Sequence, residues 1–145
     1  MTRKLVVLVV LLVAPAAQAD VGIGLFVGRP TGLDLKIGLS PRTGLDLLGG
    51  IDTFRQDAGG YAHVTYLVTP VVGGGEAVIV PLRIGIGVAV YDFGDTNAGV
   101  RVPLEIGLRF RRVPTEIYGE ICPLFQFVHD ADVILQGGVG VRFYF

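Results

Sequence analysis

The chain has 145 residues, enough for one domain, and its formal net charge of −1 gives no electrostatic reason to expect a nucleic-acid partner. Hydrophobic residues make up 51% and charged residues 17% of the sequence, and the mean hydropathy of +0.62 is high for a soluble domain. Beyond the N-terminus, no apolar run approaches the roughly 20 residues that a membrane helix needs. The apolar residues are spread over short segments instead, as a transmembrane β-barrel requires.

The first 19 residues have the pattern of a secretory signal peptide. The basic pair Arg3-Lys4 precedes an apolar run over 5–14 that is too short to span a membrane. Ala17-Gln18-Ala19 matches a cleavage site, so residues 1–19 are expected to be removed and residues 20–145 to form the mature domain. An N-terminal anchor that stays attached is the alternative.

Period-2 alternation of apolar residues predicts strands, and no helix, throughout the mature chain. The predicted strands cover 21–28, 32–39, 43–52, 61–68, 78–91, 99–111, 115–127 and 133–145. Removal of 19 residues from 145 leaves 126, which eight strands of roughly 9 to 12 residues and short turns would use. We therefore predict an all-β fold, an eight-stranded antiparallel up-and-down transmembrane β-barrel, with both termini on one side.

Prolines and glycines interrupt this pattern. Pro81, Pro103 and Pro123 lie inside predicted strands, where proline removes an N–H from the ladder, and each is expected to mark a bulge or a short break in pairing. The polar stretch 54–60 and the glycine-rich stretch 69–76 are expected to be connections.

The last predicted strand has two very different faces. Polar residues such as Gln136 and Arg142 lie on one face. The other face is apolar to the end of the sequence and consists of Val133, Leu135, Gly137, Val139, Val141, Phe143 and Phe145. An apolar last strand that ends on Phe is typical of bacterial outer-membrane barrels, where it closes the barrel against the first strand. Val139, Val141, Phe143 and Phe145 are therefore the expected closing signal; the last strand of a soluble sheet is the alternative.

Two kinds of barrel would show this alternation. A soluble lipocalin-like barrel turns its apolar face inward around a lipid, whereas a membrane barrel turns it outward. The polar face is rich in glycine with isolated charges, which suits a filled lumen because an eight-stranded barrel has room inside only for side chains. The expected lumen charges are Asp34, Lys36, Asp46, Arg83, Arg101, Glu105, Arg109, Glu116, Glu120 and Arg142.

These charges should pair, because an unpaired buried ion costs several kcal/mol. Lys36 is expected opposite Asp46, and Arg109 close to Glu116, each pair facing across a turn. Ordinary solvated pairs of little energetic value are the alternative. Exposed aromatic residues are expected to form girdles at both rims: Phe110, Phe143 and Phe145 at the periplasmic rim, and Phe93, Phe125 and Phe127 at the outer rim.

The sequence resembles a family of small bacterial outer-membrane β-barrels of unknown function, similar in architecture to the membrane domain of outer membrane protein A. The matching stretches are Gly28-Arg29-Pro30-Thr31-Gly32-Leu33, Val80-Pro81-Leu82, Gly99-Val100-Arg101-Val102-Pro103-Leu104 and Gly137-Gly138-Val139-Gly140-Val141-Arg142-Phe143-Tyr144-Phe145. These motifs are structural, so the resemblance implies a barrel and a location but no reaction.

Residues for catalysis are scarce. Ser40 is the single serine, on the expected periplasmic side, whereas His63 and His129 belong to the outer half, so no nucleophile has a base within reach. The single cysteine, Cys122, has no disulfide partner and is expected to be a packed side chain. The outer loops carry five residues that form a weak candidate for a metal or protease-like site: Asp92, Asp95, His129, Asp130 and Asp132. Solvated loop charges are the simpler interpretation. We assign no catalytic, cofactor-binding or metal residue and no cofactor.

The leading hypothesis is a non-enzymatic integral protein of a Gram-negative-type outer membrane, with a structural or surface-binding role and a filled, charge-paired lumen. The alternatives are a soluble lipocalin-like barrel that binds a fatty acid or similar lipid, and an outer-membrane enzyme of lipid A or phospholipid acyl chemistry. The expected partners are outer-membrane lipid, the barrel-assembly machinery during insertion and an extracellular ligand of unknown kind. A monomer is expected.

Overall fold

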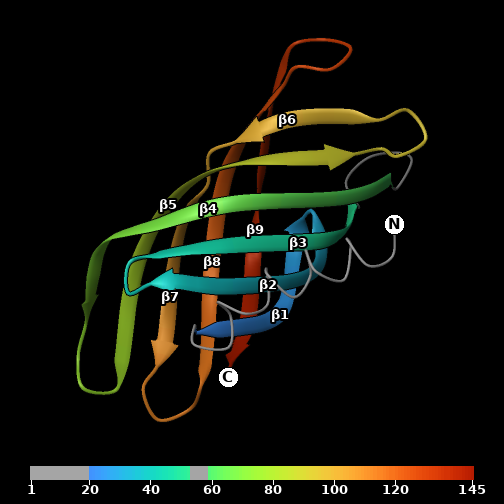
Figure 1. The fold of residues 1–145 in the computed structure, drawn as a ribbon. Coiled ribbons are helices and arrows are strands. Elements are labelled where there is room, and N and C mark those ends of the chain that lie inside the picture. The colour runs from blue at the N-terminus through green and yellow to red at the C-terminus, as the bar shows by residue number, and fades with distance from the viewer. Residues whose placement is uncertain (1–19, 53–58) are drawn as a thin grey trace, which may run out of the picture.

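The computed structural model describes residues 20–52 and 59–145; the signal-peptide prediction falls on residues 1–19, outside the described residues. The described part is all-β, and it holds no helix with the length and apolarity to cross a membrane. Its strands (Figure 1) are β1 (Val21–Arg29), β2 (Thr31–Ser40), β3 (Thr43–Asp52), β4 (Gly59–Gly74), β5 (Val78–Tyr91), β6 (Asn97–Arg101), β7 (Leu104–Phe110), β8 (Thr115–Gln126) and β9 (Asp132–Tyr144).

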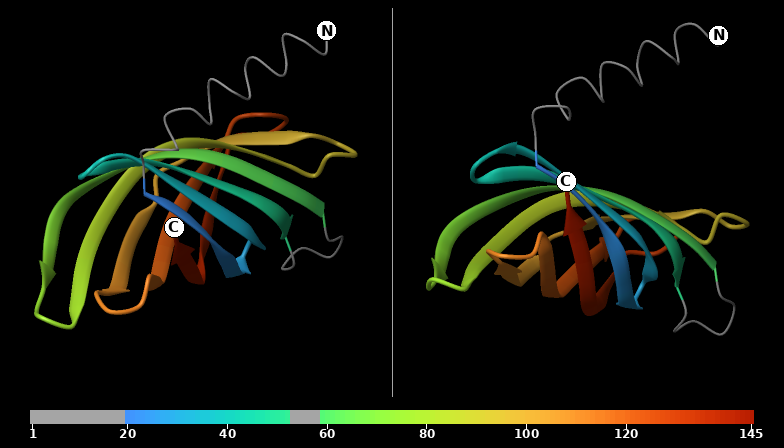
Figure 2. Two further views of the ribbon diagram at one scale, coloured as in Figure 1. Left: turned by 60° about the horizontal axis from the view of Figure 1, so that its bottom comes forward. Right: turned by 90° about the horizontal axis from the view of Figure 1, so that it is seen from below.

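The strands form one closed antiparallel barrel. Their order is β4-β3-β2-β1-β9-β8, followed by β6 and β7 and then by β5, which pairs again with β4. Figure 2 shows β4 and β5 arching over β7, β8 and β9 on the opposite side of the wall. Because β6 and β7 lie end to end between β5 and β8, they count as one interrupted strand. The predicted eight-stranded up-and-down barrel is confirmed, and it is the architecture that the resemblance implied.

The barrel has two ends that differ in what they carry. Asp20, Phe145 and the β2–β3, β4–β5 and β7–β8 turns lie at one end, which we call the terminal end. The β1–β2, β5–β6 and β8–β9 connections lie at the other, the far end. Residue 20 and the C-terminus are therefore on the same side, as an even number of strands requires.

The last strand closes the barrel against the first. β9 pairs with β1 over eight residue pairs, and the amide of Phe145 donates to the carbonyl of Val21 at 2.9 Å. The closing signal thus lies in the β1–β9 seam, where the partners are Val27 for Val139, Leu25 for Val141 and Ile23 for Phe143.

Two predicted strands differ from the structure by more than one residue at an end. β4 begins at Gly59, within the stretch 54–60 that was expected to be a connection. The stretch 69–76 is not a connection for most of its length, because β4 continues to Gly74 and pairs there with Ile79 of β5. A shift of register between Val68 and Val71 absorbs Pro70, so the ladder resumes beyond it. Glycines hide the alternation of side chains but keep their backbone N–H, so this segment still pairs.

The predicted strand 99–111 is interrupted at Val102 and Pro103. The register of β5 with β6 continues unchanged into β7, so the interruption is a break in pairing and not a bulge. The Pro103 carbonyl still accepts from the Gly85 amide at 3.1 Å, and the Pro123 carbonyl from the Val102 amide at 3.1 Å.

Pairing of β5 with β7 likewise skips Pro81 without a change of register. Pro123 stays paired with Leu135 of β9 and borders the gap between β6 and β7. Each proline was expected to mark a bulge or a short break in pairing, and Pro81 and Pro103 mark short breaks. Pro123 causes no break in the pairing of β8 with β9.

Side chains alternate between an apolar outside and a polar inside. Outward residues on opposite parts of the wall are strongly exposed, for example Leu25 at 61%, Ile86 at 60% and Leu135 at 66%. Their neighbours along each strand point inward and are buried, and most of these inward side chains are polar or charged. This inversion of the usual soluble arrangement places the candidate site inside the barrel.

Candidate functional site: a charged network inside the barrel

The inward positions gather charged residues from nearly every strand. Nine of the ten expected lumen charges are buried: Asp34, Lys36, Asp46, Arg83, Arg101, Glu105, Glu116, Glu120 and Arg142. The tenth, Arg109, is half-buried at the terminal end. Alternation along the strands explains why they share one face, because every second residue of a strand points to the same side.

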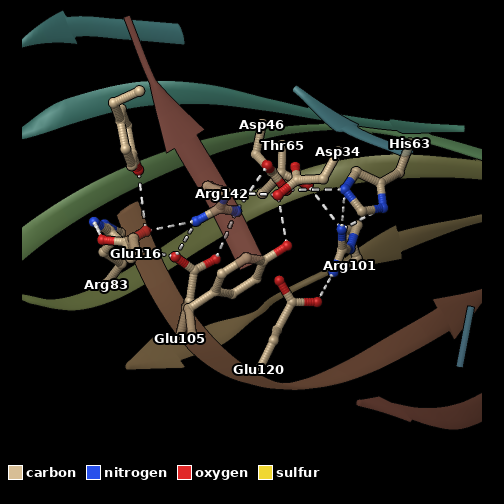
Figure 3. A network of polar contacts seen from close by, with 12 residues as sticks. Asp34, Asp46, His63, Thr65, Arg83, Arg101, Glu105, Glu116, Glu120 and Arg142 are labelled. Atoms are coloured by element: carbon tan, nitrogen blue, oxygen red, sulfur yellow. Dashed lines mark hydrogen bonds and ion pairs between the residues drawn. The ribbon is translucent and has the colours of Figure 1, made fainter. Parts of the chain in front are cut away.

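Arg142 lies at the centre of this network, which Figure 3 shows. The guanidinium is fully buried and its Cζ lies 3.6 Å from the centroid of the Tyr118 ring. Its hydrogen bonds of 2.5 to 3.2 Å go to four carboxylates on four strands: Asp34, Asp46, Glu105 and Glu116. Arg142 thereby ties β9 to β2, β3, β7 and β8 across the lumen.

The carboxylates around Arg142 also have second partners. Arg83 of β5 contacts Glu105 at 2.5 Å and Glu116 at 2.6 Å. The hydroxyls of two inward tyrosines complete the shell, since Tyr144 donates to Glu116 at 3.0 Å and Tyr118 donates to Asp34 at 2.5 Å. Such sharing matters because a buried ion is tolerated only where charge partners and hydrogen bonds replace its water.

A second cluster surrounds Arg101, closer to the far end. The Arg101 guanidinium pairs with the Glu120 carboxylate and contacts the ring of His63 (Figure 3). His63 Nε2 lies 3.0 Å from Asp46 Oδ2, which joins this cluster to the one around Arg142. Arg101 Nε also points to the buried Cys122 sulfur at 3.4 Å, so the free cysteine is a packed side chain as expected.

Aromatic residues fill the lumen toward the far end. The Tyr61 hydroxyl donates to Gln136 at 3.1 Å and lies 3.2 Å from His63 Nδ1. The Tyr61 ring stacks on Tyr91, whose hydroxyl donates to Gln126 at 2.5 Å. These tyrosines and glutamines were not predicted as lumen residues, although their places in the alternation put most of them on the polar face.

At the terminal end the two expected cross-strand pairs are adjacent in register, but their charges go elsewhere. Lys36 lies opposite Asp46, whose two oxygens contact Arg142 and His63 instead. Arg109 lies opposite Glu116, yet its guanidinium pairs with Asp20 at 2.6 Å. Register alone therefore did not determine the ionic partners.

A cavity of about 740 Å³ opens at the terminal end. Its charged lining consists of Lys36, Arg83, Arg109 and Asp20, and the rest is formed by turn residues and apolar side chains. The lumen is therefore not filled at this mouth, where residues of the β2–β3 turn and of β4 line the cavity.

The candidate nucleophile and the histidines lie apart. The Ser40 hydroxyl lies 2.7 Å from the Thr43 hydroxyl in the β2–β3 turn, at the terminal end. His63 is held inside the network, and His129 pairs with Asp95 at 3.2 Å between far-end connections. None of these contacts gives Ser40 a base.

The acidic residues of the far end do not form a metal cage. His129 and Asp95 are both largely exposed, and Asp92 accepts from Asn97 at 3.5 Å. No group of three or more His, Cys, Asp or Glu with metal-binding geometry is found among residues 20–52 and 59–145.

No protein-family model matches the chain, and no curated protein sequence matches it. Among solved structures, the chain is similar to Ail, the attachment invasion locus protein of Yersinia pestis, at 16% sequence identity. That match covers 88% of this chain and 95% of the other, with a TM-score of 0.39.

Proposed function

We propose that this protein is an integral outer-membrane β-barrel with a structural or surface-binding role, and that it catalyses no reaction. The observation that carries the proposal is the inversion of the barrel: apolar side chains point outward all around the wall while charged side chains are enclosed. Soluble monomers rarely expose contiguous apolar patches larger than a few hundred Å². A wall that is apolar on every strand fits hydrocarbon better than water.

The dimensions of the wall agree with a bilayer. Most strands have 9 to 16 residues, and a tilted transmembrane strand needs roughly 9 to 11. Exposed phenylalanines lie toward both ends, as an aromatic girdle requires: Phe110, Phe143 and Phe145 at the terminal end, and Phe93, Phe125 and Phe127 at the far end. In the proposed orientation the terminal end faces the periplasm.

The charged lumen argues against the soluble carrier. A lipocalin-like barrel needs an apolar interior to hold a lipid, and the middle of this interior is occupied by Arg83, Arg142 and their carboxylate partners. An acyl chain placed there would separate ion pairs that have no water to replace them.

The described far-end connections are short, which favours a structural role over a large binding interface. Pro30 alone joins β1 to β2, and a stable protein interface usually buries about 800 Å² on each partner. The proposal includes contact with outer-membrane lipid, insertion by the barrel-assembly machinery and a monomeric state.

Gel mobility of the outer-membrane fraction, with and without boiling, tests the proposal. A barrel that stays folded in detergent migrates faster before boiling, so we expect a mobility shift in that fraction. Recovery of the protein from the soluble periplasm without detergent, and with no shift, would contradict the membrane assignment.

A further inference from the structure

We propose that the cavity at the terminal end binds a small oxyanion, a phosphate or a carboxylate group, through the ammonium group of Lys36. This inference goes beyond the proposed function, because it assigns a ligand to a site that a purely structural barrel would not need. It rests on the burial of Lys36, on the absence of an anionic partner for it, and on the charges that line the cavity.

Lys36 is a buried cation with no ion pair to the residues that the structure describes. Its relative exposure is 9%, and it lines the cavity. Within residues 20–52 and 59–145, no hydrogen bond or ion pair is found for its ammonium group, and its Nζ lies 6.0 Å from the centroid of the Tyr144 ring. That distance is at the outer limit of a cation–π interaction, so the contact replaces little of the lost hydration.

The carboxylate opposite Lys36 in register contacts other residues. Asp46 lies directly opposite on β3, but its Oδ1 accepts from Arg142 at 3.1 Å and its Oδ2 lies 3.0 Å from His63. Both described contacts of Asp46 are directed to the interior, and no ion pair joins its carboxylate to the Lys36 ammonium in the described residues.

The lining of the cavity favours an anion. Three cationic side chains, Lys36, Arg83 and Arg109, line the cavity with one carboxylate, that of Asp20, which pairs with Arg109 at 2.6 Å. Arg83 forms ion pairs with Glu105 and Glu116, and neither of those two carboxylates lines the cavity.

Hydroxyl donors and space complete the site. Ser40 and Thr43 place two hydroxyls in the lining, 2.7 Å apart, and a hydroxyl can donate to an oxyanion that Lys36 holds. The volume of about 740 Å³ exceeds what one phosphate or carboxylate group fills. A larger molecule that carries such a group would therefore fit, with its remaining atoms against apolar residues such as Leu39 and Val72.

The test is isothermal titration calorimetry, in which inorganic phosphate is titrated into the full-length protein purified in a zwitterionic detergent. We expect saturable binding that Lys36→Gln weakens about tenfold or more, because a charge-assisted hydrogen bond is lost. Arg111→Gln is the matched control: it removes the same charge at the same end of the barrel, but Arg111 does not line the cavity and its Nε donates to the Gly75 carbonyl. Binding to this variant should be unchanged.

If Lys36→Gln does not fold, Arg109→Gln provides a second variant at the half-buried rim, with the same expected weakening. Acetate in place of phosphate shows which oxyanion is preferred. Addition of an anionic phospholipid to the micelles distinguishes the source: competition with phosphate identifies a lipid headgroup, and no competition identifies a free anion.

The proposal is overturned if the wild-type protein shows no saturable phosphate binding, or if Lys36→Gln and Arg111→Gln weaken binding equally. Either result would mean that the deeper carboxylates balance the Lys36 charge without a ligand. The boiled and unboiled gel samples are independent of this outcome, so failure of the anion site would leave the membrane barrel intact.

Discussion

Replacement of Arg142 is the sharpest test of the interior network. Arg142→Met keeps an unbranched side chain as far as the position of Nε but removes the guanidinium group and its five hydrogen bonds to four carboxylates. Added separately at about 1.5 to 3 kcal/mol each, these bonds would amount to roughly 8 to 15 kcal/mol. The sum overstates the loss, because every carboxylate retains another partner such as Arg83, His63 or the Tyr118 hydroxyl.

We therefore expect a loss of about 3 to 5 kcal/mol in the free energy of unfolding, the usual cost of breaking a buried ion pair by removing one partner. The assay is the folded fraction on unboiled gels across a urea series. Arg111→Met is the control, with an expected change within about 0.5 kcal/mol, because Arg111 is exposed at the terminal end.

A second substitution tests the cause of the loss. If the cost comes from carboxylates left in excess, Arg142→Met combined with Glu105→Gln should recover part of it, since Glu105 accepts two of the five hydrogen bonds. Equal unfolding midpoints for Arg142→Met and Arg111→Met would refute the reasoning, and so would a double variant less stable than Arg142→Met alone.

Further predictions test the wall, the packing, the lumen and the absence of chemistry. Leu25→Arg, at the middle of the outward face, should destabilise the protein in a bilayer by about 2 to 4 kcal/mol, whereas Val113→Arg in the β7–β8 turn should cost about 1 kcal/mol or less; equal costs would argue for an aqueous outside. Gly140→Ala should cost about 1 to 3 kcal/mol in the same urea assay, because its new Cβ would meet a tyrosine ring at 2.3 Å, while Gly49→Ala, with nothing within 4 Å, should be neutral. Wild-type protein in planar bilayers should give no large steady conductance, and steady channels would contradict the plugged lumen. His63→Ala should leave the lipid A of the membrane unchanged by mass spectrometry; altered lipid A would revive the enzyme hypothesis.

Two predicted strands have the same bounds as in the structure. Residues 43–52 and 78–91 were predicted as β3 and β5, with the same ends as in the structure. Alternation failed at 69–76, where consecutive glycines carry no side-chain signal although their backbone pairs normally. The sequence pattern indicates to which face of a strand a side chain points, so it gives no information at glycines, which have no side chain.

The residues of the candidate site could be predicted from the sequence, but the contacts between them could not. Alternation placed Asp34 and Arg142 on the same face, yet they are 108 residues apart and their strands are separated in the barrel by β1. Which inward residues meet across the lumen depends on the tilt and stagger of the strands, and a residue pattern within one strand does not encode these. The pairing of Arg109 with Asp20 shows the same limit, since it joins β7 to a residue that precedes β1.

Charge balance explains how such an interior can exist at all. The ten lumen residues comprise five cations and five anions, so their formal charges cancel. The distribution is uneven, however: the five carboxylates are packed with three arginines in the middle, while Lys36 and Arg109 lie at the mouth of the terminal cavity. Most apolar residues face outward, and the buried apolar cluster inside the barrel is small: Phe26, Leu48, Tyr61, Ala89, Tyr91, Tyr118 and Leu124. The ion pairs supply the other contacts across the lumen, and the stability of the barrel should therefore depend strongly on a few inward arginines.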